Sequence, residues 1–178
     1  MNKVAVVGYG YWGPNIVRNF YNHPDCEVSY ICDLDNDNLN RAKNDFSNPE
    51  LITDFSKIID DNSIDIVAIV TPVSTHYELA KEVLKAKKHL FIEKPLVQSV
   101  SQADELIKLA KKNNLVAVVD HTFLFTGSVK KIKDIIDSGE IGEMIYFDST
   151  RVNLGIFQHD IDVIWDLAPH DLSILFYI

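Results

Sequence analysis

The stretch VVGYGYWGPN, Val6–Asn15, combines an apolar run with three closely spaced glycines. It runs from apolar residues through Gly8, Gly10 and Gly13 into a segment of helical period whose first turn carries Pro14. A G-x-G-x-x-G pattern alone is a weak signal, because glycine-rich turns are common. Between a strand and a helix, however, the first glycine permits a tight turn, the second lets the backbone approach a phosphate and the third lets helix and strand pack closely. The stretch therefore predicts a strand–turn–helix unit that holds a nucleotide phosphate.

The rest of the first 120 residues alternates short β-branched runs with segments of helical period. The runs are apolar almost throughout, as in strands that are covered on both faces. This alternation predicts an α/β fold with a doubly wound parallel sheet of the Rossmann type. The expected strands are 4–7, 28–32, 64–70, 89–92 and 115–119, and helices are expected around 38–46, 55–59, 79–84 and 103–110, with caps at Asp35, Asp54, Thr75 and Ser101.

The pattern changes near residue 120, which divides the chain into a nucleotide-binding domain (1–120) and the beginning of a second α/β domain (121–178). A helix is expected over 128–137 with Gly139 after its end, then a longer strand over 143–155 and a helix from 163 onward. A lone strand and a mostly apolar helix are hard to stabilise in isolation. We expect that the remainder of the second domain is missing; the alternative is a complete small protein that covers its apolar end by forming an oligomer.

The composition is that of a soluble globular protein, with 47% hydrophobic and 24% charged residues among 178. No apolar stretch approaches the roughly 20 residues that span a bilayer, and the start lacks a signal-peptide pattern, so no membrane partner is expected. The net charge of -9 and the lack of a basic cluster argue against nucleic acid. Cys26 and Cys32 cannot build a disulfide framework, which favours reduced thiols in a cytoplasmic protein. No histidine or cysteine pair has ligand spacing, so no metal site is expected.

Asp33 ends the second expected strand, 20 residues after Gly13. A carboxylate at this point can bind the hydroxyls of an adenosine ribose. The residues LDNDN that follow contain no arginine, so a 2′-phosphate would meet negative charge, and NAD is favoured over NADP as the cofactor. Tyr11 and Trp12 of the glycine loop are expected to line the same cofactor. The alternative role for Asp33 is that of a turn or helix-capping carboxylate.

Further candidates lie at the ends of later strands, where ligands of such sheets bind. Thr71 and Pro72 follow the strand expected over 64–70 and are expected to flank the nicotinamide half of the cofactor. His76 is expected on the exposed first turn of the next helix, and it is a weaker candidate for a cofactor contact.

Two more strand ends carry groups capable of proton chemistry. Glu93 and Lys94 follow the strand 89–92 and are expected to contact the cofactor. The Lys94 ammonium in a partly buried cleft can also orient a substrate hydroxyl or share its proton. A solvated surface charge is the alternative. His121 follows the strand 115–119 and either lines the substrate pocket or is a buried core histidine.

The stretch WDLAPHD places Asp166 and His170 four residues apart, so both lie on one face if the segment is helical. A carboxylate near a histidine can fix its tautomer and raise its pKa, which suits a base that takes a hydroxyl proton. On spacing alone, the pattern favours a pair on the helix surface over a catalytic pair.

The four stretches VVGYGYWGPNIVRNF, TPVSTHYELA, FIEKP and WDLAPHD together resemble, in this order, the Gfo/Idh/MocA oxidoreductases. The resemblance extends over essentially the whole chain and implies an N-terminal Rossmann domain followed by a mixed α/β sheet domain. It implies NAD(P)-dependent hydride transfer at a secondary hydroxyl of a sugar or nucleotide-sugar. His170 is then the acid/base, Lys94 and Asp166 orient the substrate and the histidine, and Arg151 and Asn153 are substrate contacts.

Members of this family are much longer than this chain. Their second domain supplies one wall of the substrate pocket and usually the oligomer interface, so the resemblance also implies a homo-oligomer. The rival interpretation is a non-catalytic NAD-binding module, or a degenerate fragment, that acts as a redox sensor or binds a partner.

Overall fold

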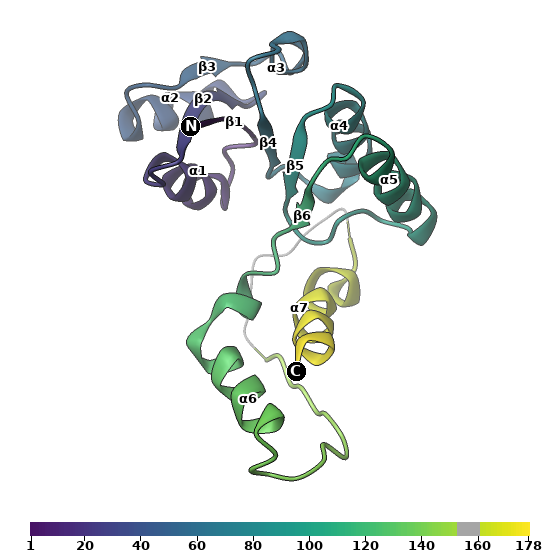
Figure 1. Ribbon diagram of the computed structural model, residues 1–178. Coiled ribbons are helices and arrows are strands. Elements are labelled where there is room, and N and C mark those ends of the chain that lie inside the picture. Colours follow the sequence, from purple (N-terminus) through teal and green to yellow (C-terminus); the bar gives the residue numbers. More distant parts are fainter. Residues whose placement is uncertain (153–160) are drawn as a thin grey trace. The chain divides into compact units, whose positions relative to one another are not determined.

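Six parallel strands build the sheet of the first half of the chain, in the order β3-β2-β1-β4-β5-β6 (Figure 1). The order reverses beside β1, which pairs with both β2 and β4, as in a doubly wound sheet. The predicted Rossmann-type α/β fold is therefore confirmed. The strands are β1 (Asn2–Val7), β2 (Cys26–Cys32), β3 (Glu50–Ile52), β4 (Ile66–Ile69), β5 (His89–Ile92) and β6 (Ala117–Val119).

The computed structural model describes residues 1–152 and 161–178, which divide into two units, Met1–Val119 and Asp120–Ile178. The first unit holds the sheet and five helices, and the second holds helices only among the residues described. The helices of the first unit are α1 (Gly13–Tyr21), α2 (Asn36–Asp45), α3 (Ser56–Asp60), α4 (Val73–Lys85) and α5 (Val100–Lys112).

Alternate residues of β1 face two separate halves of the core, because successive side chains of a strand point to opposite faces of the sheet. Val4 and Val6 belong to the half that includes the buried side chains of α1 and α2. Ala5 and Val7 belong to the half that includes those of α3, α4 and α5. Each face of the sheet is thus covered, which explains why its strands are apolar almost throughout.

The helix caps agree with the sequence only in part. Asp35 caps α2 as predicted and accepts a hydrogen bond from the Asp37 N–H at 2.8 Å. The cap at Thr75 is wrong, because α4 begins directly after Pro72 and Thr75 lies inside it. The cap at Ser101 is also wrong: Ser99, which has the same spacing to Gln102, accepts from the Gln102 N–H at 3.3 Å.

Asp54 bonds the first turn of α3 from just outside it. Phe55 takes the capping position, while Asp54 Oδ1 accepts from the Ser56 N–H at 2.9 Å. The expected carboxylate is therefore present, displaced by one residue from the cap itself.

The second unit contains the 3₁₀ helix η1 (Thr122–Phe125), α6 (Gly127–Asp137) and α7 (Val163–Tyr177). Gly139 follows α6 with φ +72°, as expected after a helix end. The strand expected over 143–155 is wrong for 143–152, which form no strand; 153–155 lie outside the described residues. A strand needs a neighbour, and the described part of this unit offers none. Within the described ranges, no helix is long and apolar enough to cross a membrane.

Candidate functional site

The glycine loop after β1 packs tightly against the end of β4. Gly8 has φ +99° and its N–H donates to the Cys32 carbonyl at 2.8 Å. A Cβ on Gly8 would lie 2.5 Å from Val70 O, and one on Gly13 would lie 2.5 Å from Gly8 O. Two of the three glycines are therefore required by the backbone itself, one for its positive φ and both for close approach.

Gly10 differs from its neighbours, because a Cβ there would meet nothing within 4 Å. The loop thus has an open surface at this residue, and α1 begins three residues later with N–H groups that have no partner within the helix. Helix N-termini favour anions, so the residues present fit the pyrophosphate of a dinucleotide. Tyr11 and Trp12 are 77% and 40% exposed and flank this surface.

Asp33 follows β2 and ties the glycine loop to it. Its Oδ2 accepts from the Tyr9 N–H at 2.6 Å and from Asn38 Nδ2 at 3.1 Å, and its Oδ1 accepts from the Asp35 N–H at 2.8 Å. The structure thus gives Asp33 the turn role that the sequence left open. The ribose role remains a prediction for the same carboxylate.

Tyr9 and Arg41 are residues of this region that the sequence analysis did not identify. The Tyr9 side chain is fully buried, its hydroxyl donates to Asp45 Oδ2 at 2.7 Å, and burial raises its pKa. Arg41 Nη2 donates to Tyr9 O at 2.8 Å and to Asn38 Oδ1 at 2.7 Å. No arginine follows Asp33 directly in the sequence. In the structure, however, α2 brings Arg41 to the Tyr9 backbone, close to Asp33.

The loop after β4 is fixed from within. Thr71 Oγ1 lies 2.7 Å from Thr75 Oγ1, and Thr75 Oγ1 donates to Pro72 O at 2.8 Å. His76 is fully buried, in contrast to the exposed position expected for it. Because α4 begins at Val73, His76 falls on the inward stripe of that helix, in register with Ala80 and Val83.

The loop after β5 carries the proposed proton-handling lysine. The Glu93 N–H donates to Ile69 O at 2.9 Å, which extends the pairing of β5 with β4 past the end of the strand. The Lys94 N–H donates to Glu93 Oε2 at 3.2 Å, both residues are half-buried, and Pro95 is buried. Glu93 and Lys94 therefore stand at the same carboxyl edge of the sheet as the glycine loop and Asp33.

In the second unit, His170 lies on α7 with Asp166 one turn before it, as the sequence predicted. Its ring packs edge-on against Phe123 of η1, with centroids 4.7 Å apart and planes at 82°. His121 precedes Phe123, and burial lowers its pKa, while Asp120 acts in the opposite direction. The segment at the start of this unit thus supplies neighbours for the candidate base.

Arg151, a predicted substrate contact, is engaged within the protein. Its Nε donates to Asp171 Oδ2 at 2.6 Å, and its guanidinium lies 5.0 Å from the centroid of the Phe123 ring. Arg151 also lowers the pKa of Asp171, which accepts a second hydrogen bond from Ser149 Oγ at 2.8 Å. Asn153, the other predicted contact, lies outside the described residues.

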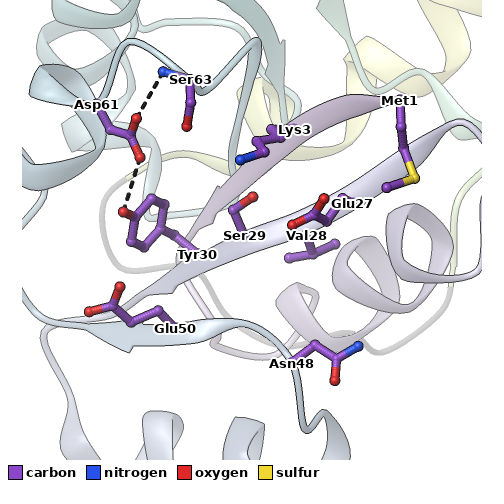
Figure 2. Close-up of a pocket in the computed structure, with 10 residues that line it drawn as sticks. All are labelled: Met1, Lys3, Glu27, Val28, Ser29, Tyr30, Asn48, Glu50, Asp61 and Ser63. Atoms are coloured by element: carbon purple, nitrogen blue, oxygen red, sulfur yellow. Dashed lines mark hydrogen bonds between the residues drawn. The ribbon is translucent and has the colours of Figure 1, made fainter.

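A separate pocket opens near the amino ends of β1, β2 and β3 (Figure 2). Its Asp61 carboxylate accepts from the Tyr30 hydroxyl at 3.0 Å and from the Ser63 N–H at 2.8 Å. None of the predicted site residues lines this pocket, which lies at the sheet edge opposite to Asp33 and Lys94. Its lining residues are Met1, Lys3, Glu27, Val28, Ser29, Tyr30, Asn48, Glu50, Asp61 and Ser63.

Comparison with known proteins gives a consistent result. The Gfo/Idh/MocA family, described as an oxidoreductase family with an NAD-binding Rossmann fold, matches residues 2–121. The uncharacterised oxidoreductase YdgJ of Escherichia coli K12 is 31% identical over 96% of this chain and 51% of its own length. The myo-inositol 2-dehydrogenase of Thermotoga maritima is 28% identical over 99% of this chain and 54% of its own.

A solved NAD-binding protein from Listeria innocua superposes with a TM-score of 0.90, at 25% identity, over 99% of this chain and 55% of its own. The chain therefore spans about half the length of the relatives it matches.

Proposed function

The chain belongs to the Gfo/Idh/MocA oxidoreductases, and on this premise we propose that it takes part in NAD-dependent hydride transfer at a secondary hydroxyl of a sugar, cyclitol or nucleotide-sugar. The observation that carries the proposal is the gathering of the glycine loop, Asp33 and the Glu93–Lys94 loop at one edge of the sheet. Ligands of open α/β sheets bind at this edge, beside the point where strand order reverses.

The polyol class of the substrate is supported by one relative, which is named for dehydrogenation of myo-inositol. Inositols and sugars share a ring that carries several secondary hydroxyls. Such a substrate needs hydrogen-bond donors and acceptors around the reacting carbon, and the candidate residues Lys94, Asp166 and His170 are of these types.

We assign the cofactor contacts to two groups of residues. The N–H groups at Gly10 and the start of α1 are proposed to hold the pyrophosphate, with Tyr11 and Trp12 beside it. Asp33 is proposed to accept from the adenosine ribose hydroxyls, and Thr71 and Pro72 to border the nicotinamide half. When bound, the nicotinamide ring supplies the hydride acceptor, so the protein has only to place the groups and manage the proton.

Proton management is proposed for three side chains. Lys94 donates a hydrogen bond to the reacting oxygen and holds the substrate in place. His170 takes the hydroxyl proton during oxidation and returns it during reduction. Asp166, on the same face of α7, favours the protonated form of His170 once it has taken the proton.

The test replaces Lys94 or His170 by alanine in the longest natural protein that contains this sequence, with Lys111→Ala as a matched control on the exposed end of α5. Turnover should fall about 100-fold or more while the Kd for NADH changes less than about threefold, since removal of a general acid or base costs about 10²–10⁴ in rate. Equal losses of turnover and cofactor affinity would contradict the catalytic roles. Tight NADH binding with no turnover on any polyol would favour the non-catalytic module.

A further inference from the structure

His76 connects two loops that lie at the ends of neighbouring strands. Its Nε2 is 2.9 Å from Thr71 O, in the loop after β4. Its Nδ1 is 2.9 Å from Pro95 O, in the loop after β5. The side chain is fully buried, so these contacts are made away from water. A carbonyl oxygen can only accept, and a neutral imidazole carries one N–H, so the neutral ring donates to one of the two carbonyls while its other nitrogen lies beside the second; donation to both requires the imidazolium form.

We propose that His76 is a positioning residue, which holds the loop of Thr71 and the loop of Lys94 in fixed relation to each other. It does this from inside the protein and touches neither cofactor nor substrate. The significance of the clamp for hydride transfer rests on the proposed function, whereas the clamp itself rests on the two contacts alone.

The effect of the clamp extends to the glycine loop through close packing. Gly8 lies against Val70 and Thr71 so closely that a Cβ on it would be 2.5 Å from Val70 O and 3.0 Å from Thr71 N. Movement of the Thr71 loop therefore displaces the turn that is proposed to hold the pyrophosphate. On the other side, Pro95 follows Lys94 directly, so the anchored Pro95 carbonyl limits where the Lys94 backbone can lie.

The sequence offers a matched set of variants for a test. Leucine at position 76 removes both ring nitrogens at similar volume. Asparagine places an amide nitrogen where Nδ1 lies, and glutamine places one where Nε2 lies, so each retains a donor toward one loop only. Val83→Ala, at a fully buried position on the same helix, controls for general loss of packing.

The measurement is amide hydrogen exchange of the chain without cofactor, followed in peptides that cover 70–75 and 93–98. His76→Leu should raise the exchange rate about tenfold in both segments, a factor that corresponds to about 1.4 kcal/mol. Val83→Ala should change the exchange rates of these two segments and of the rest of the sheet by the same factor. His76→Asn should restore protection mainly at 93–98, and His76→Gln mainly at 70–75.

The proposal is overturned if His76→Leu protects both segments as well as Val83→Ala does, or if the asparagine and glutamine variants both exchange as fast as the leucine variant. NADH titration of the same proteins is read separately. A wild-type chain that binds no NADH would refute the proposed function, whereas the exchange pattern would still decide whether the clamp exists.

Discussion

The loop glycines provide a prediction in which stability and cofactor affinity separate. Gly13→Ala places a Cβ 2.5 Å from Gly8 O, a backbone atom that cannot move aside without shifting β1 or α1. Overpacking of this kind costs about 1–3 kcal/mol of unfolding free energy. Gly10→Ala places a Cβ in open space, so its unfolding free energy should change by less than about 0.5 kcal/mol.

Gly10→Ala, which should hardly change stability, should strongly weaken cofactor binding. The added methyl group occupies the surface proposed for the pyrophosphate and removes hydrogen bonds from backbone N–H groups to a charged ligand. Such bonds contribute about 1.5–3 kcal/mol, so Gly10→Ala should raise the Kd for NADH roughly 10- to 100-fold.

Urea unfolding without cofactor and titration of NADH fluorescence measure the two quantities on the same variants. A Gly10→Ala chain that binds NADH as tightly as the wild type would refute the proposed approach of the pyrophosphate. A Gly13→Ala chain with unchanged unfolding would refute the close packing of α1 on β1.

Three further predictions follow from single side chains. Asp33→Ala should raise the NADH Kd at least about tenfold and also lower the unfolding free energy by about 1–3 kcal/mol, because the part-buried Tyr9 N–H loses its acceptor; unchanged stability would contradict that bond. Asp35→Ala should cost about 1 kcal/mol in urea unfolding through loss of the α2 cap, with NADH affinity unchanged. Burial raises the pKa of the Cys32 thiol from 9.0 to about 11, so the stability it contributes is present below pH 9 and is lost as the pH rises toward 11. Unfolding measured from pH 7 to 11 should show this loss in the wild type and not in Cys32→Ala.

Much of the first unit could be predicted, because strands buried on both faces have an unmistakable apolar pattern. The roles of Gly8 and Gly13 could also be predicted, because the motif implies a tight turn and a close contact between backbones, and both are present in the structure. The three-residue β3 was missed, because so short a run carries no period.

The burial of His76 could not be predicted from the spacing of residues alone, because it depends on where α4 begins. A start two residues earlier than the expected cap at Thr75 turns the ring from the surface into the core. The apolar stripe of α4, continued back from Ala80 by four residues, reaches His76 and is the signal that identifies it.

Contacts between segments that are distant in the sequence could not be predicted either. Arg41 contacts Tyr9 because α2 packs beside the glycine loop, and no local sequence pattern predicts this contact. The strand expected over 143–155 illustrates a related point, since alternation indicates a strand only where another strand is present to pair with it.

A chemical-shift map of the ¹⁵N-labelled chain on addition of NAD locates the cofactor site directly. We expect the shifts to concentrate in Gly8–Gly13, around Asp33, and in the loops of Thr71 and Lys94, at the carboxyl edge of the sheet. Shifts confined to Lys3, Glu27 and the other residues of the pocket at the opposite edge (Figure 2), or no shifts at millimolar NAD, would contradict this expectation.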